Sequence, residues 1–154
     1  MIDYALRRVL PADYKSLPTS TSARPLAGDI EGYLHGGLTG PIAAWLALSR
    51  VDELSPGDLI AWQISDDAGD TGHAMVVLAA PAQNPARAGE WLVRIADSTV
   101  NLHAADSRPR GTTGLGTGTI GLVVDDRGAP IAFYWQGGIS KQATPTEIAL
   151  GRPL

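Results

Sequence analysis

The chain has 154 residues, of which 44% are hydrophobic and 18% charged, and it carries a formal net charge of −4. This size predicts a single domain with a substantial core, and no apolar run approaches the ~20 residues that cross a bilayer. The acidic balance argues against nucleic acid as a partner, because phosphate binding needs a concentrated basic surface. The chain has no cysteine, which excludes disulfides, cysteine-rich zinc sites and thiol chemistry.

The first predicted element is a helix over residues 2–10, where apolar side chains recur at helical spacing and Pro11 ends the pattern. The charges within it and the lack of a cleavage site exclude a secretory signal peptide. No Ser, Thr, Asp or Asn precedes the first apolar residue to cap the helix. We therefore expect a helix that is shortened at its start and exposes apolar surface, which favours a homodimer.

A loop rich in Ser, Thr and Pro is predicted over residues 15–25. A second helix is predicted over residues 26–35, ended by Gly36 and Gly37. Residues 42–51 fit a helix and a strand equally well, and the sequence leaves both open.

From Pro56 onward the pattern changes to short runs rich in Val, Ile and aromatic residues. Five strands are predicted, over residues 59–64, 73–80, 90–96, 119–124 and 131–135. A hairpin turn is expected at 125–130, and a glycine–threonine loop between 106 and 118. The helices precede the strands, which predicts one α+β domain over residues 1–136 and a polar C-terminal tail over 137–154.

His73 opens one predicted strand and Asp97 closes the next. If these strands are antiparallel neighbours, the end of one lies beside the start of the other, and the carboxylate reaches the imidazole. A histidine held by a carboxylate is the acid–base part of many nucleophilic hydrolases. The structural alternatives are a strand-edge histidine bonded to a backbone carbonyl and an aspartate in an Asx turn.

The motifs around these residues resemble the NlpC-type, papain-like superfamily of cell-wall cysteine peptidases. The resemblance rests on residues 54–62 (LSPGDLIAW), 71–77 (TGHAMVV) and 95–99 (IADST). It implies a papain-like arrangement of N-terminal helices followed by an antiparallel sheet, and hydrolysis of a peptide or amide bond, with a peptide or peptidoglycan-like substrate. By the same resemblance, His73 would be the general base and acid, and Asp97 would orient it.

The departure from that family is the nucleophile. The family's cysteine opens a helix, and residues 2–6 resemble the continuation of that helix, so the cysteine would fall a few residues before Met1. Either the chain begins too late or its lineage has lost the thiol, and the uncapped helix favours the first. We expect a cysteine-hydrolase domain that lacks its nucleophile and is inactive as given. The alternative is a non-catalytic domain that binds a ligand or a protein partner.

No cofactor and no metal are predicted. The three histidines, His35, His73 and His103, do not have the spacing of a zinc motif. His35 is interpreted as a helix-end histidine and His103 as an exposed side chain, while Arg108 is expected in a surface ion pair.

Overall fold

The computed structural model describes residues 2–19, 23–36, 40–42, 44–64 and 72–154. The helices come first along the chain and comprise α1 (Ile2–Val9), α2 (Pro11–Ser16), α3 (Ala27–Gly36) and a 3-10 turn, η1 (Val51–Glu53). The strands are β1 (Gly40–Ile42), β2 (Trp45–Leu48), β3 (Leu59–Trp62), β4 (His73–Val77), β5 (Ala82–Gln83), β6 (Glu90–Thr99), β7 (Gly114–Val124), β8 (Pro130–Tyr134), β9 (Thr144–Pro145) and β10 (Ala149–Pro153). None of these described helices has the length and apolar character needed to cross a membrane.

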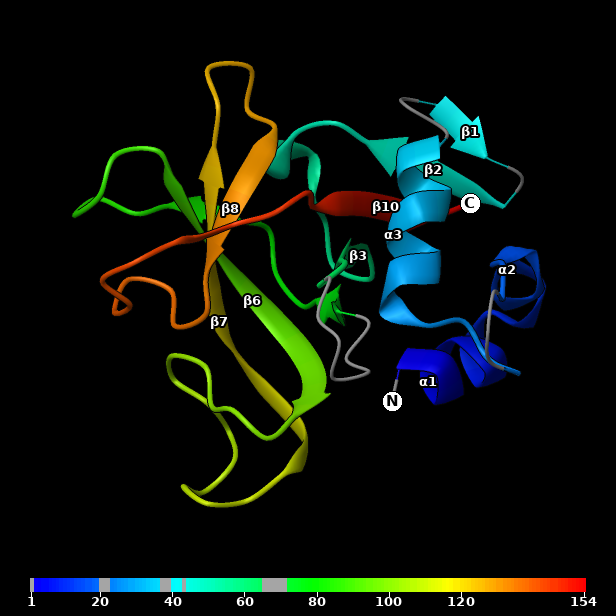
Figure 1. Cartoon of the computed structure of the whole chain (residues 1–154), viewed down its shortest axis with the longest axis horizontal. Coiled ribbons are helices and arrows are strands. Elements are labelled where there is room, and N and C mark those ends of the chain that lie inside the picture. Colours follow the sequence, from blue (N-terminus) through cyan, green and yellow to red (C-terminus); the bar gives the residue numbers. More distant parts are fainter. Residues whose placement is uncertain (1, 20–22, 37–39, 43, 65–71) are drawn as a thin grey trace.

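The ten described strands form one sheet in which every pairing is antiparallel. Their order is β1-β2-β10-β3-β4-β6-β7-β8-β9, and β5 pairs with β6. The longest pairing joins β6 to β7, from Glu90 opposite Val123 to Thr99 opposite Gly114. Figure 1 shows these two strands as a long twisted pair that runs obliquely through the half of the view opposite the helices.

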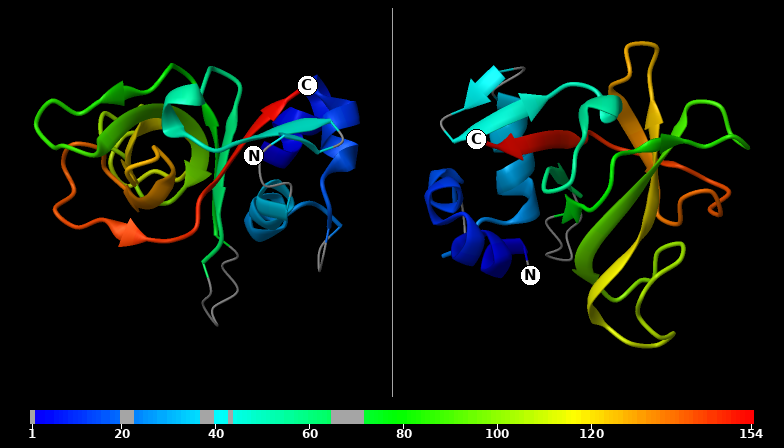
Figure 2. Two further views of the ribbon diagram at one scale, coloured as in Figure 1. Left: turned by 90° about the horizontal axis from the view of Figure 1, so that it is seen from above. Right: turned by 180° about the vertical axis from the view of Figure 1, so that it is seen from behind.

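The C-terminal segment, which the sequence predicted as a polar tail, contributes β9 and β10. β10 lies between β2 and β3, with Leu150 opposite Leu48 on one side and Ile60 on the other. Figure 2 shows this last strand running back across the molecule toward the helices. Its apolar run is only a few residues long and is followed by Arg152 and Pro153, so composition did not distinguish it from a loop.

Two clusters of buried side chains form the hydrophobic core on the two faces of the sheet. One lies between the helices and the strands β2, β3 and β10, and includes Leu34 and Trp45. The other joins β3, β4, β6, β7 and β8 and includes Trp62. Strand β3 belongs to both, because Leu59 packs in the first group and Ile60 in the second. Burial on both faces explains why this strand is a continuous apolar run.

The predicted α+β, papain-like arrangement of helices followed by a sheet is wrong. The structure is mostly antiparallel sheet, and its three described α-helices have only 8, 6 and 10 residues. The helical periodicity was read correctly for α1 and α3. However, the sheet is larger than predicted because β1 and β2 precede the five expected strands, β5 lies between two of them, and β9 and β10 follow them. Glycine, proline or threonine in β1, β9 and β10 concealed these three strands, β5 has only two residues, and β2 lies in the segment for which the sequence left helix and strand open.

The structure also shows what the remaining predicted turns and connecting segments form. Pro11 ends α1 but also occupies the first turn of α2, where its missing N–H has no cost. The ambiguous segment 42–51 contains β2 and η1, and the turn at 125–130 joins β7 to β8 as predicted. Strand β7 begins at Gly114, inside the predicted glycine–threonine loop. Gly37 and Thr71 lie outside the described residues.

The placement of β10 in the core can be tested by truncating one buried and one exposed side chain of the C-terminal segment. Leu150 is 2% exposed and Leu154 is 66% exposed. We expect Leu150→Ala to lower the free energy of unfolding by about 2–5 kcal/mol, because it leaves a cavity in the core. Leu154→Ala, the control, should change it by no more than about 0.5 kcal/mol. Urea denaturation measures both, and equal effects would contradict the placement of β10.

Candidate functional site

The antiparallel pairing of β4 with β6 brings His73 and Asp97 together. His73 Nε2 lies 2.6 Å from Asp97 Oδ2. The His73 side chain is 16% exposed, whereas Asp97 has no exposed surface. The proximity expected from the two predicted strands is therefore confirmed, while the catalytic roles of the two residues remain predictions.

Asp97 occupies a core position of β6. Val93, Ile95 and Asp97 alternate along the strand, and all three are fully buried. Side chains two residues apart share one face of a strand, so the carboxylate stands where the two preceding positions carry aliphatic groups. A buried charge is costly unless it is paired and hydrogen-bonded. The surroundings of Asp97 supply two hydrogen-bond partners for Oδ2 and an ion pair for Oδ1, which has no hydrogen bond.

The first of these partners besides His73 is His103, from the loop after β6. Its Nε2 lies 2.8 Å from the same Asp97 Oδ2, and its Nδ1 lies 2.9 Å from the backbone carbonyl oxygen of Trp135. His103 is 3% exposed, so the prediction that it is exposed is wrong. The polar sequence around it did not reveal that its backbone N–H donates to Asp106 Oδ2 and folds the loop inward.

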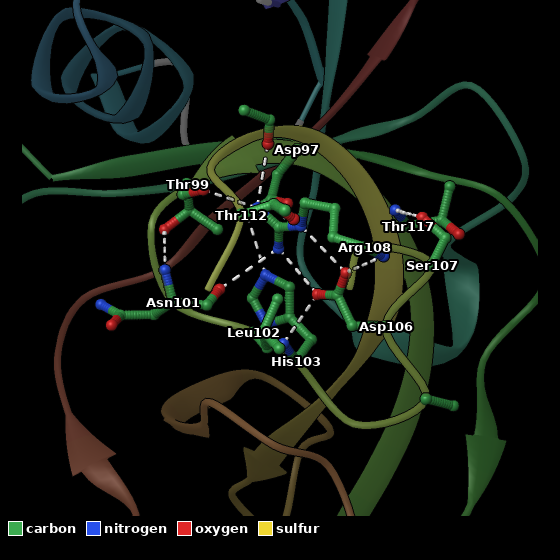
Figure 3. A network of polar contacts seen from close by, with 12 residues as sticks. Asp97, Thr99, Asn101, Leu102, His103, Asp106, Ser107, Arg108, Thr112 and Thr117 are labelled. Carbon is green, nitrogen blue, oxygen red and sulfur yellow. Dashed lines mark hydrogen bonds and ion pairs between the residues drawn. The ribbon is translucent and has the colours of Figure 1, made fainter. Parts of the chain in front are cut away.

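The second partner is Arg108, whose Nη2 lies 3.8 Å from Asp97 Oδ1. Figure 3 shows its guanidinium between Asp97 and Asp106, beside the His103 ring. It also donates hydrogen bonds to three carbonyl oxygens, those of Thr99, Asn101 and Gly114. The Arg108 side chain is 5% exposed. The prediction of a surface ion pair is therefore wrong, because Arg108 fastens both ends of the 99–114 loop from inside.

The glycines of β7 make room for these two side chains. A Cβ on Gly116 would lie 2.3 Å from Arg108 Nε, and a Cβ on Gly118 would lie 2.4 Å from the His103 Cβ. Both glycines are therefore required by close approach rather than by turn geometry. Alternate glycines in a strand were the one sequence signal that pointed to buried side chains crossing β7.

Aromatic rings surround the His73 imidazole. The centroid of the Trp135 ring lies 5.1 Å from that of His73 in an edge-on arrangement, and the Trp62 ring lies 5.7 Å away. Trp62 in turn stacks on Phe133 with centroids 4.3 Å apart. These rings restrict the orientation of His73 and limit access of water to its contact with Asp97.

Two carboxyl groups in the network have a lowered pKa. Burial alone would raise the pKa of Asp97, but hydrogen bonds and charge from His103 and His73 outweigh this effect and lower it to about 2. The hydrogen bond from the Arg108 side chain is the main reason why the pKa of Asp106 lies far below its usual range. Both groups are therefore carboxylates at neutral pH.

Two groups of side chains in the described part of the chain have ligand atoms close enough for one metal ion. The first is His73, Asp97 and His103, and the second is Glu31, His35 and Glu147. In the second group Glu31 and His35, one turn apart on α3, already form an ion pair with each other. The structure thus separates His35 from the other two histidines.

A sizeable cavity in the described structure lies away from this site. It has a volume of about 690 Å³ and is lined by residues of α3, β8 and the segment before β10, among them His35, Ile131 and Glu147. Its walls do not include His73 or Asp97. We place the candidate site at His73 because a partly exposed imidazole on a buried carboxylate is an arrangement typical of acid–base sites.

Comparison with known proteins does not add to this geometry. A scan against protein-family models, a search of curated proteins and a search of solved structures each found no match.

The lowered pKa of Asp97 predicts a loss of stability in acid. The pKa is about 2 in the folded chain and about 3.9 in an unfolded one, so the unfolded state binds more protons between these values. The stabilisation is therefore present above about pH 4 and is lost as the pH falls through 2, which corresponds to about 2 kcal/mol. The free energy of unfolding of the wild type should fall by that much more than that of Asp97→Asn between pH 6 and pH 2.

Urea titrations at a series of pH values provide this measurement. Asp106 remains in both proteins, so its own acid sensitivity cancels in the difference. Parallel pH dependences would mean that Asp97 is not stabilised as a carboxylate.

Proposed function

We propose that this chain is a domain of the peptide- or amide-hydrolase type, in which His73 is the acid–base group and Asp97 its orienting carboxylate. As given it has no cysteine nucleophile, so we propose that it binds peptide-like ligands without cleaving them by thiol chemistry. The observation that carries the proposal is the 2.6 Å contact between His73 Nε2 and the buried Asp97 Oδ2.

The hydrogen-bond pattern supports a base at His73. Asp97 is ionised and can only accept, so His73 Nε2 must carry the proton that joins them. In a neutral ring the lone pair then lies on Nδ1, the nitrogen that is not bonded to Asp97. A general base needs such a fixed tautomer with one nitrogen free to take a proton.

The chemistry of this pair follows from that tautomer. His73 Nδ1 takes a proton from a nucleophile and returns it to the leaving group, while Asp97 stabilises the intervening imidazolium without itself becoming protonated. The nucleophile is the part that this chain lacks. Removing the nucleophile from such a site abolishes most of the rate and leaves binding and charge stabilisation.

The ligand class is proposed from the motifs and the aromatic surroundings. The segments 54–62, 71–77 and 95–99 resemble those of cell-wall peptidases, which favours a short peptide of the peptidoglycan kind. Trp62 and Trp135 flank His73. Trp62 is fully buried and shapes the site from behind, whereas Trp135 is partly exposed and can offer its indole ring to a ligand.

Binding can be tested with a peptidoglycan tripeptide in NMR titrations of the 15N-labelled chain. We expect saturable shift changes at Gly72, Ala74 and the indole N–H of Trp135, and no cleavage product by mass spectrometry. His73→Ala should weaken binding at least about fivefold. His35→Ala is the control, since His35 lies on α3 outside the site. Absence of saturation at millimolar peptide would contradict the proposed ligand.

The base itself can be tested without a thiol, using an activated ester such as p-nitrophenyl acetate. A neutral imidazole with a free nitrogen promotes hydrolysis of this ester directly. We expect His73→Ala to lower the protein-dependent rate about tenfold and Asp97→Asn to lower it as well, because general-base catalysis needs the correct tautomer. His35→Ala corrects for reaction at a surface imidazole. If His73→Ala retains the full rate, His73 is not an accessible base.

A further inference from the structure

We infer that His103 is a positioning residue of this site: it is held as an imidazolium between the Trp135 carbonyl and Asp97, and by neutralising Asp97 it leaves His73 available as a neutral base. The inference about His73 rests on the proposed function. The charge state of His103 does not, because it follows from contacts within the folded chain.

The two ring nitrogens of His103 both face hydrogen-bond acceptors. Nδ1 lies 2.9 Å from the carbonyl oxygen of Trp135, and Nε2 lies 2.8 Å from Asp97 Oδ2. A neutral imidazole has one N–H and one lone pair, so one of these contacts would oppose a lone pair to an oxygen. Two N–H groups on His103 satisfy both acceptors.

The local charges balance only with that second proton. Asp97 and Asp106 are the carboxylates of the cluster, and Arg108 is paired with both. One arginine against two carboxylates leaves a net charge of −1. A charged His103 brings the sum to zero in a group whose members are almost fully buried. Low exposure makes such neutrality favourable, because uncompensated buried charge is poorly solvated.

This balance of charges determines whether the His73 ring carries one proton or two. A lone carboxylate beside an imidazole favours the charged ring, since opposite charges within a few ångströms stabilise each other. Asp97 already interacts with two other groups, a hydrogen bond joining His103 to Oδ2 and an ion pair joining Arg108 to Oδ1. The negative charge of Asp97 therefore stabilises a second proton on His73 less strongly. His73 therefore keeps its Nε2–H bond to Asp97 while Nδ1 stays unprotonated.

A metal ion at the same three residues fits less well. A divalent cation in place of the His103 proton would leave the cluster with a charge of +1 next to Arg108. The two nitrogen–oxygen distances, 2.6 and 2.8 Å, are hydrogen-bond distances. Ligand atoms that share one zinc ion in tetrahedral geometry lie about 3.3 Å apart, given bonds of about 2.0–2.1 Å.

His103 is also fixed sterically, as a positioning residue must be. Its ring packs against that of Trp135 with centroids 4.3 Å apart. Its Cβ occupies the space that the absent side chain of Gly118 leaves over β7. A methyl group at position 118 would therefore push His103 away from Asp97, which provides a second way to perturb the contact without removing the imidazole.

The charge state can be measured on the intact chain labelled with 15N-histidine. The three histidine rings are assigned with the variants His35→Gln and His103→Gln. We expect both ring nitrogens of His103 to carry protons at about pH 7, and Asp97→Asn to remove one of them. An unprotonated nitrogen on wild-type His103 at that pH would overturn the inference. Displacement of these protons by one equivalent of zinc would also overturn it, in favour of a metal site.

The positioning role is measured by the pH profile of ester hydrolysis. Without the imidazolium, Asp97 favours the charged form of His73, so the profile of His103→Gln should move upward by about one pH unit. Gly118→Ala should move it in the same direction, and Leu115→Ala, an exposed position on the same strand, should leave it unchanged. A lower rate with an unchanged profile would mean that His103 is merely structural. If no ester activity is found, the proposed function fails, but the protonation of His103 can still be read.

Discussion

A carboxylate at a core position of the sheet is the constraint on which this site depends. Asp97 follows Val93 and Ile95 on the buried face of β6 and has no exposed surface. Its charge must be compensated within the protein, and three cationic or proton-donating side chains surround it: His73 on β4, and His103 and Arg108 on the loop after β6. The loop after β6 returns to the sheet because two of these partners lie on it. Its hydrogen bonds to Asp106 and its glycine-lined path over β7 are consequences of the same requirement.

The sequence predicted those parts of the molecule that depend on local pattern. Short runs rich in Val, Ile and aromatic residues identified β3, β4 and β6, and neighbouring antiparallel strands then placed His73 beside Asp97. The burial of His103 was missed because it arises from loop closure, through Asp106 and the space at Gly118, which no local periodicity reports. The place of β10 was missed for a similar reason, since a strand of five residues becomes recognisable only between the partners β2 and β3.

The papain-like arrangement was wrong for a different reason. The motifs on which it rested lie in residues 54–99, which form β3, β4 and β6 and their connections. They contain no information about how many strands flank this centre, and the chain adds strands on both sides of it. A short motif therefore predicted the contact between two side chains better than it predicted the architecture that holds them.

The cost of the buried network helps to choose between the two functional hypotheses. Buried ion pairs seldom stabilise a fold more than well-packed apolar residues of the same volume, and β6 carries such residues at the two preceding inward positions. A domain that only bound peptides beside Trp135 would gain nothing from a charged group behind that ring. A carboxylate that fixes one nitrogen of His73 would serve proton transfer at the other, and the proposed imidazolium at His103 would keep that nitrogen free. The buried network is therefore a reason to propose acid–base chemistry at His73 in addition to the binding of peptide-like ligands.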